Sequence, residues 1–333
     1  MKVFELNDSN RKQLAETTTK VLSNGGVAIV PTDTVYGLIC DGRNLQAKDK
    51  IFRMKGRSYE KPLIGFVNTI EKVTTFAHIP HPALPFIRKR WPGATTFIFK
   101  SKEPLAYMSS NQGNIAFRIP AYNLISDITK EFDIVASTSA NISGQETPST
   151  IKQMPDCLKQ MADIIICGGR VNGRSSSIWY VTKQPPRLLR GNILFVCEGN
   201  SCRSPMAEFI LRELLKDVNT SIKIESAGIN ILRCGSISSN TCEVMKEAGI
   251  NMDGFIAKPL TDCLVKNADL IFVMDETQRQ RILFSFPEAE NINVLNVHEP
   301  VNSDIEAYRQ IRDKLFHVIK ESVVPRIINI HER

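Results

Sequence analysis

The stretch Ile193–Glu208, ILFVCEGNSCRSPMAE, decides the fold of the second half of the chain. It opens with a short apolar run, residues 193–196, of the kind found in buried strands. Residues 197–204 then predict a tight loop, and Pro205 suits the first turn of a helix, where a missing N–H group costs no hydrogen bond. A strand, loop and helix in this order direct several backbone N–H groups and a helix N-terminus at one point, which predicts an anion site.

Two reactive side chains of this loop, Cys197 and Arg203, are separated by five residues, and Ser204 follows them. The positive field of such a loop favours the thiolate form of a cysteine. The planar guanidinium of Arg203 can hold two phosphate oxygens at once. The spacing therefore predicts a cysteine nucleophile in a phosphate-binding loop rather than a buried structural cysteine.

The length and composition of the chain predict about two globular domains. No apolar run approaches the ~18 residues that a membrane span needs, and residues 1–13 lack the apolar core of a signal peptide. The 8 cysteines are scattered, with no spacing typical of metal ligands. We therefore expect reduced thiols, a cytoplasmic protein, no membrane partner and no protein-bound metal.

The net charge of +7 is unevenly spread. Residues 1–190 carry 26 Lys and Arg against 15 Asp and Glu, whereas residues 191–333 carry 16 against 20. The basic half favours phosphate-bearing or polyanionic ligands, but charge alone does not separate RNA from ATP.

The first half reads as a helix over residues 9–23, a strand over 27–31 and several further apolar strands that end in small polar residues. Lys55, Arg57 and Lys61 precede one of these strands. Cations beside strand-end hydroxyls predict a phosphate-binding concavity. The alternative is a mixed sheet with ordinary basic loops, since neither of the familiar glycine-rich nucleotide motifs is present.

The motifs PTDTVYGL, KGR…KPL, RWPG…TF, FRIP, STSANISG, SSSI and LLRG occur in this order. Residues 10–191 thereby closely resemble the YrdC-like threonylcarbamoyl-AMP synthases. The resemblance implies an α/β fold, with a twisted mixed-sheet domain over residues 1–191. It also implies synthesis of threonylcarbamoyl-AMP from L-threonine, bicarbonate and ATP, with Mg²⁺ accompanying the ATP and pyrophosphate released. Partner proteins of tRNA modification would then transfer the threonylcarbamoyl group to tRNA.

The same resemblance implies two sets of binding residues. The threonine-binding set is Thr34, Arg118, Ser137 and Ser176, in which the guanidinium would meet the carboxylate of the amino acid. The ATP-binding set is Lys55, Arg57, Lys61, Asn114, Ser139, Asn141, Thr147 and Arg190. Many relatives have a histidine where this chain has Phe66, so a polar contact to threonine is expected to be missing.

In the second half, strands alternate with helices, which predicts a parallel sheet with a site at the C-terminal end of the first strand. The pieces VCEGNSCRSPMAE, SAG, NADLIFVMDE and a late acid–Pro loop with downstream Tyr308 resemble the low-molecular-weight protein-tyrosine phosphatases over residues 192–325. The resemblance implies a four-stranded parallel-sheet phosphatase domain over residues 192–333.

The implied reaction begins with attack of the Cys197 thiolate on phosphorus, giving a phosphocysteine. Arg203 and the loop residues Gly199, Asn200, Ser201 and Ser204 would bind the phosphoryl oxygens. The general acid of the family is Asp before Pro, and this chain has Glu299 there. His298 could shuttle protons, although a surface histidine is the simpler interpretation.

The substrate is left open between phosphotyrosine-type monoesters and phosphoarginine in a phosphorylated protein. Relatives acting on phosphoarginine tend to have Thr at the position of Ser201, and Val301-Asn302 replace the aromatic residues of tyrosine-directed members. No cysteine follows Cys263, which disfavours an arsenate reductase. Cys202 could trap Cys197 as a disulfide or simply be a packed residue. A further alternative is that one half only binds a nucleotide, RNA or a phosphoprotein without catalysis.

Overall fold

The computed structural model describes residues 2–218, 220–231, 237–299 and 304–327. The chain divides into two compact units, Met1–Pro186 and Arg187–Glu332. Strand β11 (Arg187–Cys197) lies wholly in the second unit. The predicted boundary between residues 191 and 192 therefore falls inside a strand.

The first unit is built on a mixed sheet, as the resemblance predicted, with strand order β1-β9-β2-β3-β8-β4-β7-β6-β10 and β5 paired to β6. Its strands are β1 (Lys2–Glu5), β2 (Ala28–Val30), β3 (Gly37–Asp41), β4 (Ile64–Phe66), β5 (Ala77–His78), β6 (Thr95–Ser101), β7 (Asn114–Arg118), β8 (Val135–Ser139), β9 (Ile164–Cys167) and β10 (Ser177–Tyr180). Its helices are α1 (Arg11–Ser23), α2 (Leu45–Lys55), α3 (Ile70–Phe76), α4 (Leu84–Arg90), α5 (Asn123–Lys130) and α6 (Asp156–Met161).

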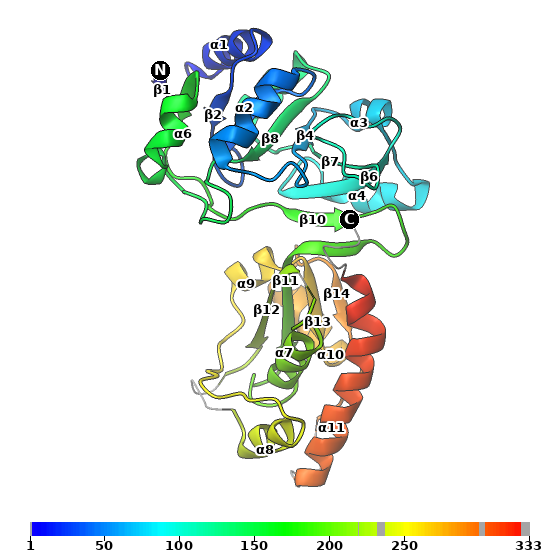
Figure 1. The fold of residues 1–333 in the computed structure, drawn as a ribbon. Coiled ribbons are helices and arrows are strands. Elements are labelled where there is room, and N and C mark those ends of the chain that lie inside the picture. The colour runs from blue at the N-terminus through cyan, green and yellow to red at the C-terminus, as the bar shows by residue number, and fades with distance from the viewer. Residues whose placement is uncertain (1, 219, 232–236, 300–303, 328–333) are drawn as a thin grey trace. The chain divides into compact units, whose positions relative to one another are not determined.

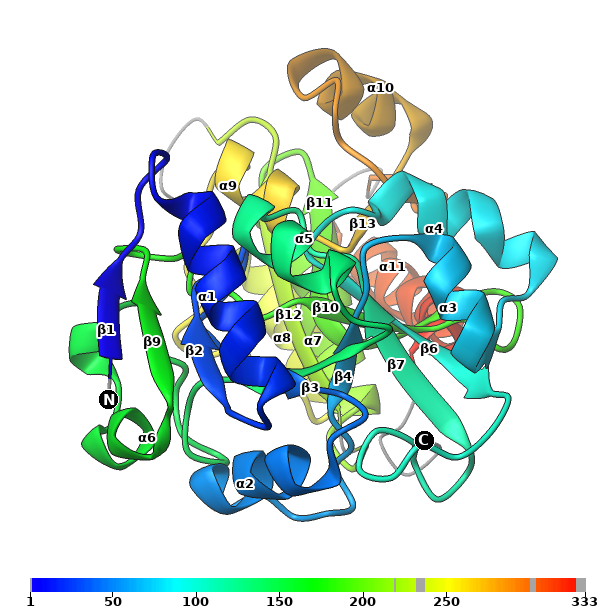
Figure 2. The ribbon, with the colours of Figure 1, turned by 90° about the horizontal axis from the view of Figure 1, so that it is seen from above.

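Helices α1 and α5 lie side by side over one face of this sheet (Figure 2). They are amphipathic, and their apolar faces bury residues such as Leu14, Leu22 and Ile125 against apolar side chains of five strands. Helix α1 ends before Gly25, which has a φ of +79° that suits glycine at a helix C-terminus. These contacts close an apolar layer on this face of the sheet. The polar residues at the ends of the strands lie outside the layer, where they can contact ligands.

Among its described residues, the second unit contains four strands, all parallel, in the order β12-β11-β13-β14, which confirms the predicted four-stranded sheet. Besides β11, the strands are β12 (Ser221–Gly228), β13 (Leu270–Val273) and β14 (Ile292–Val294). The helices are α7 (Arg203–Leu214), α8 (Ser239–Glu247), α9 (Asp262–Asn267), α10 (Glu276–Ser285) and α11 (Ile305–Val318), which continues into the π-helical turn Ile319–Val323 (Figure 1).

Side-chain caps fix where the helices that follow α7 begin. Ser238, Thr261, Asp275 and Asp304 each accept a hydrogen bond from a backbone N–H in the first turn of α8, α9, α10 and α11, respectively. Helix α7 begins at Arg203, two residues before Pro205, which was predicted as its first-turn residue. Proline still fits there because the first N–H groups of a helix have no intrahelical partner.

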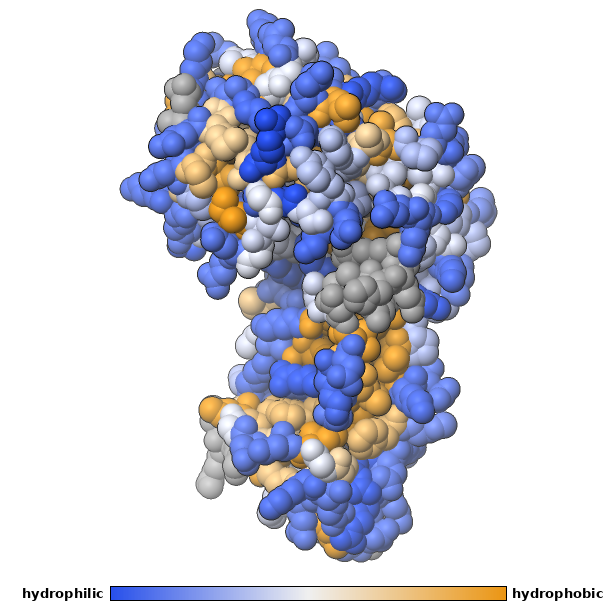
Figure 3. All heavy atoms as spheres, in the orientation of Figure 1, coloured by the Kyte–Doolittle hydropathy of each residue, from blue (hydrophilic) through white to orange (hydrophobic). Residues whose placement is uncertain are grey.

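The face shown in Figure 3 is hydrophilic over much of both units, with patches of apolar residues between the charged ones. The large apolar side chains that the structure exposes most are Phe284 and Ile256, at 90% and 74%. Over the described ranges, we find no helix that combines the length and the apolar character of a membrane span.

Candidate functional site

The thiol of Cys197 lies at the C-terminal end of β11, the strand between β12 and β13. The residue is 3% exposed, and its Sγ lies 2.9 Å from the Oγ of Ser204. Parallel strands on both sides fix the position of the strand end. The sulfur is therefore held at the point where the loop begins, as the rule for open α/β sheets predicts.

The backbone of the loop after Cys197 packs against the end of β12. The N–H of Ile229 donates to the Cys197 carbonyl at 3.0 Å. A Cβ atom on Gly228 would lie 2.9 Å from both the Asn200 nitrogen and the Glu198 carbonyl oxygen, closer than such atoms approach. Only glycine fits there, which gives the SAG motif a physical reason.

Asn200 holds the middle of the loop. Its φ of +50° lies in the left-handed region, which asparagine tolerates better than most residues. Its amide nitrogen donates to the Oγ atoms of Ser204 and Ser226, both at 2.9 Å, and its Oδ1 accepts from the N–H of Lys258 at 2.9 Å. These contacts stabilise an otherwise costly conformation. The loop motif predicts Asn200 but not Ser226, whose place in SAG was the available signal.

The guanidinium of Arg203 is almost completely buried and faces two acids. Its Nη2 donates to Oε1 of Glu299 at 2.5 Å, and its Nη1 lies 3.5 Å from Oδ2 of Asp275. The Nη1 group also donates to the Val297 carbonyl at 3.3 Å. Glu299 is 66% exposed, so it can move away when another anion binds. Asp275 was missed, although an acid directly after a buried strand was visible in the sequence.

The remaining loop residues anchor a neighbouring helix. The Ser201 carbonyl accepts from the N–H of Ser238 at 3.0 Å and from Oγ1 of Thr241 at 3.3 Å, so the loop holds the start of α8. Burial raises the pKa of Cys202 to about 11, which keeps this thiol protonated. Gly199 has ordinary space around it, with Oγ of Ser201 at 3.4 Å from its Cβ position. Residues 300–303, which include Val301-Asn302, lie outside the described residues.

In the first unit, the structure joins Arg118 and Thr34 of the predicted threonine set. Arg118 is 3% exposed and donates from Nη1 to Oγ1 of Thr34 at 2.8 Å. It also donates from Nη2 to Oδ1 of Asp33 at 2.5 Å and from Nε to the Gly93 carbonyl at 2.9 Å. Burial lowers the pKa of this guanidinium and Asp33 opposes the shift. Asp33 lies inside PTDTVYGL but was not predicted as a site residue.

Phe66, the residue that departs from the family pattern, lies directly beside Arg118. The two residues are paired in register on β4 and β7, and the Cζ of Arg118 lies 5.8 Å from the centroid of the Phe66 ring. Phe66 is 4% exposed and belongs to the apolar layer under α1 and α5. The ring therefore packs under the guanidinium, where a cation–π contact is favourable.

The other two predicted threonine residues, Ser137 and Ser176, are also buried, at 3% and 5% exposed. Ser137 lies on β8, and its Oγ would be 3.6 Å from a Cβ on Gly37. The Oγ of Ser176 lies 2.9 Å from Oγ1 of Thr96, a residue that the sequence analysis missed. Within the set, a hydrogen bond joins Arg118 to Thr34.

On the predicted ATP side, Lys55 is buried at the end of α2. Its ammonium donates to the Ser139 carbonyl, to the Asn141 carbonyl at 2.6 Å and to Oδ1 of Asn141 at 2.9 Å. The Oγ of Ser139 donates to the same Oδ1 at 2.6 Å. Burial, with a smaller effect of the Arg57 charge, lowers the pKa of Lys55 to about 7. Three of the predicted residues thus form one cluster.

The other predicted ATP residues are less tightly connected. Arg57 donates to the carbonyls of Lys61 and Pro62 at 2.7 and 3.1 Å, which shapes the loop that carries both cations. The side chain of Lys61 is exposed and has no partner among the residues described. Asn114 is buried at the start of β7, Thr147 is half-buried in the loop after β8, and Arg190 lies on β11 of the second unit.

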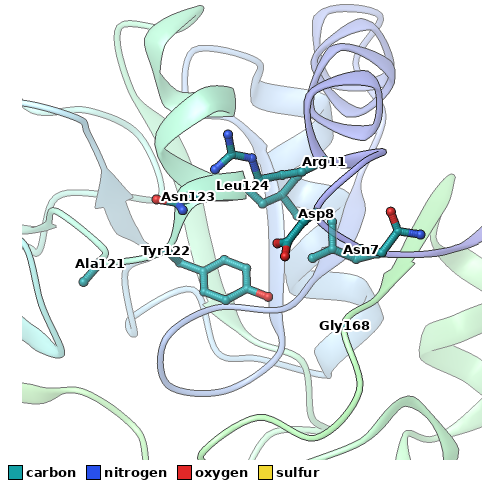
Figure 4. Close-up of a pocket in the computed structure, with 9 residues that line it drawn as sticks. Asn7, Asp8, Arg11, Ala121, Tyr122, Asn123, Leu124 and Gly168 are labelled. Carbon is teal, nitrogen blue, oxygen red and sulfur yellow. The ribbon is translucent and has the colours of Figure 1, made fainter.

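A pocket of about 330 Å³ opens beside the Arg118 cluster. Figure 4 shows Asp8 and Arg11 reaching it from the entry to α1, and Tyr122 and Asn123 from the entry to α5. The neighbouring Ala121 N–H donates to Oδ2 of Asp33 at 3.1 Å. None of the predicted threonine or ATP residues lines this pocket. Within the described ranges, no group of three or more His, Cys, Asp or Glu could hold a metal ion.

The fold and these sites define an α/β protein of two units, the second carrying a buried cysteine in the loop between a parallel strand and a helix. Residues 20–191 match the family model Sua5/YciO/YrdC, described as "Telomere recombination", and the chain belongs to this family. Residues 192–323 match the model described as "Low molecular weight phosphotyrosine protein phosphatase", so the chain also carries a domain of that kind.

Curated relatives exist for each unit. The putative threonylcarbamoyl-AMP synthase of Methanocaldococcus jannaschii is 33% identical over 172 residues, 51% of this chain and 81% of that protein. The protein-arginine-phosphatase of Bacillus subtilis is 29% identical over 140 residues, 39% of this chain and 93% of that protein. The chain spans about half, 51% and 54%, of the synthases of Pyrococcus abyssi and B. subtilis.

Among solved structures, P. abyssi Sua5 complexed with L-threonine is similar with a TM-score of 0.54 and 20% identity. The match covers 99% of this chain and 100% of that chain. At this identity the likeness shows the fold alone.

Proposed function

We propose that the first unit makes threonylcarbamoyl-AMP from L-threonine, bicarbonate and MgATP. The observation that carries this proposal is the buried Arg118. A guanidinium has five N–H groups, and three of them meet Gly93, Thr34 and Asp33. The two others have no partner among the described residues and suit the carboxylate of an amino acid. The names of the curated relatives support the same assignment.

The ATP side requires cations, because pyrophosphate leaves with concentrated negative charge. Lys55, Arg57 and Lys61 would neutralise the triphosphate as the bond to the α-phosphorus breaks. Ser139 and Asn141, which hold Lys55, would set its position, and Asn114 and Thr147 would complete the part of the nucleotide side that the first unit supplies. The protein's contribution to this reaction is positioning rather than covalent catalysis. We propose that the synthase domain ends at residue 191.

Threonine- and bicarbonate-dependent release of pyrophosphate from ATP tests this function. Arg57→Ala and Lys61→Ala should each reduce it. Release of pyrophosphate that is independent of threonine would contradict the proposal, and no release at all would favour a unit that only binds nucleotide or RNA. The product would be consumed by partner proteins of tRNA modification, and the cytoplasm is the proposed compartment because it holds ATP and keeps thiols reduced.

We propose that the second unit hydrolyses a phosphorylated protein through a phosphocysteine. The substrate phosphate takes the guanidinium of Arg203, which releases Glu299 from its ion pair, and the released carboxylate takes up a proton from the solvent. The Cys197 sulfur then bonds to phosphorus while the bond to the leaving group breaks, and the leaving atom takes a proton from Glu299. Water next attacks phosphorus and gives its proton to the Glu299 carboxylate, and the S–P bond breaks to return thiolate and inorganic phosphate.

Phosphoarginine is the substrate that we favour over phosphotyrosine. The small Ser201 occupies the position where phosphoarginine-directed relatives tend to carry Thr, and an arginine phosphatase is among the similar proteins. Hydrolysis of p-nitrophenyl phosphate, abolished by Cys197→Ser, tests the chemistry. A comparison of phosphoarginine and phosphotyrosine peptides tests the substrate, and a clear phosphotyrosine preference would overturn it. If neither peptide is hydrolysed, the second unit is a module that binds a phosphoprotein without catalysis.

A further inference from the structure

A buried carboxyl group, Glu208, lies at the end of a row of hydrogen bonds that reaches the nucleophile. Glu208 lies on the second turn of α7 and is 4% exposed. Its Oε2 accepts from the hydroxyl of Ser226 at 2.5 Å, and its Oε1 pairs with Arg212 at 2.5 Å. The reaction described above gives this carboxyl no role. Burying a carboxylate is costly, so a position that keeps one calls for a reason.

The direction of each hydrogen bond between Glu208 and Ser204 is fixed by its partners. The hydroxyl hydrogen of Ser226 points at Glu208, so its lone pairs face the amide nitrogen of Asn200 at 2.9 Å. The same nitrogen donates its other hydrogen to Oγ of Ser204, also at 2.9 Å. Because Oδ1 of Asn200 accepts from the N–H of Lys258, the amide cannot be turned around. Ser204 therefore accepts from Asn200 and keeps its own hydrogen for another acceptor.

Two acceptors compete for that hydrogen. The Sγ of Cys197 lies 2.9 Å from Oγ of Ser204, and the Ala227 carbonyl lies at 3.4 Å. A hydrogen bond to the sulfur stabilises the thiolate, whereas one to the carbonyl does not. Because Glu208 fixes Ser226 and Asn200, the Asn200 amide donates to the Ser204 oxygen. This favours donation of the Ser204 hydroxyl hydrogen to its nearer acceptor, the Sγ of Cys197.

We propose that Glu208 is a positioning residue of the phosphatase site, which acts through Ser226 and Asn200 to direct the Ser204 hydroxyl at the Cys197 thiolate. This inference rests on the proposed function of the second unit. Burial raises the pKa of Glu208, while the bonds to Ser226 and Arg212 and the charge of Lys258 oppose the shift and that of Glu225 adds to it.

Substitution by leucine separates this role from a simple charge effect. Removal of a nearby negative charge would by itself favour the thiolate, so the pH midpoint of thiol alkylation would fall. Loss of the directing hydrogen bonds would do the opposite and raise the midpoint. The positioning role and the charge effect of Glu208 thus predict shifts of the alkylation midpoint in opposite directions.

The experiment measures the rate of alkylation of Cys197 by iodoacetamide against pH in the full chain. Mass spectrometry of the peptide that carries Cys197 excludes the exposed Cys157 and Cys263. Glu208→Leu and Ser226→Ala should each raise the midpoint by about one pH unit. Glu208→Gln keeps an acceptor for Ser226 and should restore the midpoint to within about 0.3 unit. Glu213→Gln, on the same helix but exposed and paired with Lys216, is the control and should change nothing.

A midpoint that falls or stays unchanged in Glu208→Leu overturns the proposal. If that variant does not fold, by circular dichroism, the decision passes to Ser226→Ala, for which an unchanged midpoint has the same meaning. Arg203, Asp275 and Glu299, the charged groups around the loop, are intact in all these variants. Alkylation needs no turnover, so failure of the phosphatase assay and failure of this inference are distinguishable.

Discussion

The carboxylate of Glu299 lies 2.5 Å from Nη2 of Arg203, the group proposed to bind the substrate phosphate. The proposed general acid therefore occupies the phosphate fork before a substrate arrives. Because its side chain is 66% exposed, displacing it costs little burial. Binding of the phosphate and release of the acid become one event.

Glu299→Gln should separate these two roles. We expect turnover of a phosphopeptide with a poor leaving group to fall about 100-fold, since the proton donor is lost. Turnover of p-nitrophenyl phosphate, whose leaving group needs little protonation, should fall much less. Inorganic phosphate should inhibit the variant at lower concentration, because a neutral amide competes less well for Arg203. Unchanged turnover with both substrates would show that another group is the acid.

Gly228→Ala should damage the catalytic loop without touching a reacting group. The added Cβ would lie 2.9 Å from two backbone atoms, the Asn200 nitrogen and the Glu198 oxygen, which cannot rotate away. We expect a loss of about 1–3 kcal/mol in the free energy of unfolding of the second unit. The kcat/KM for p-nitrophenyl phosphate should fall at least about tenfold, because the loop amides lose their alignment. Pyrophosphate release by the same preparation is the internal control and should be retained.

The sequence predicted the part of each site that lies in one continuous motif. Cys197, Asn200, Arg203 and Ser204 occur within eight consecutive residues, so a single pattern holds their chemistry. The partners that come from other strands were missed. Ser226 and Asp275 reach the loop only because β12 and β13 flank β11, a pairing that no local pattern specifies.

The first unit shows the same division. The mixed sheet followed from seven ordered motifs, yet the contact between Thr96 and Ser176 depends on the pairing of β6 with β10. The sequence predicts that a polar contact to threonine is missing at Phe66, because many relatives have a histidine there. Its packing under Arg118 required the register of β4 with β7.

The charge of Lys55 should respond to ATP. Burial lowers its pKa to about 7, so at pH 8 the free protein carries this amine mostly neutral. A bound triphosphate favours the ammonium form and raises the pKa, so ATP binding at pH 8 should take up a proton. Calorimetry in two buffers of different ionisation enthalpy measures that uptake. At saturating ATP, Lys55→Met should show less uptake, and Lys61→Met should keep it.

The lowered pKa of Lys55 also predicts how the free energy of unfolding changes with pH. Between about pH 7 and about 10.4 the unfolded chain binds more protons at Lys55 than the folded one. The free energy of unfolding contributed by this group therefore rises with pH over that window and is absent in Lys55→Met. Denaturant titrations at pH 7 and pH 9 measure the difference. Parallel pH slopes for wild type and variant would contradict the buried, lowered-pKa lysine.

Arg118→Lys should separate threonine binding from ATP binding. A lysine ammonium can still pair with Asp33, but it cannot hold Thr34, the Gly93 carbonyl and a substrate carboxylate through one planar fork. We expect the KM for threonine to rise about 10- to 100-fold, which corresponds to about 1.4–2.8 kcal/mol of lost binding. The KM for ATP should change less than about twofold, since Lys55 and Arg57 are untouched.

Phe66→Leu is the matched control for loss of the ring alone. It should cost about 0.5–1 kcal/mol of stability, because the cation–π contact is lost while the apolar layer stays filled. If Arg118→Lys raises both constants equally, Arg118 supports the fold of the unit rather than the carboxylate of threonine.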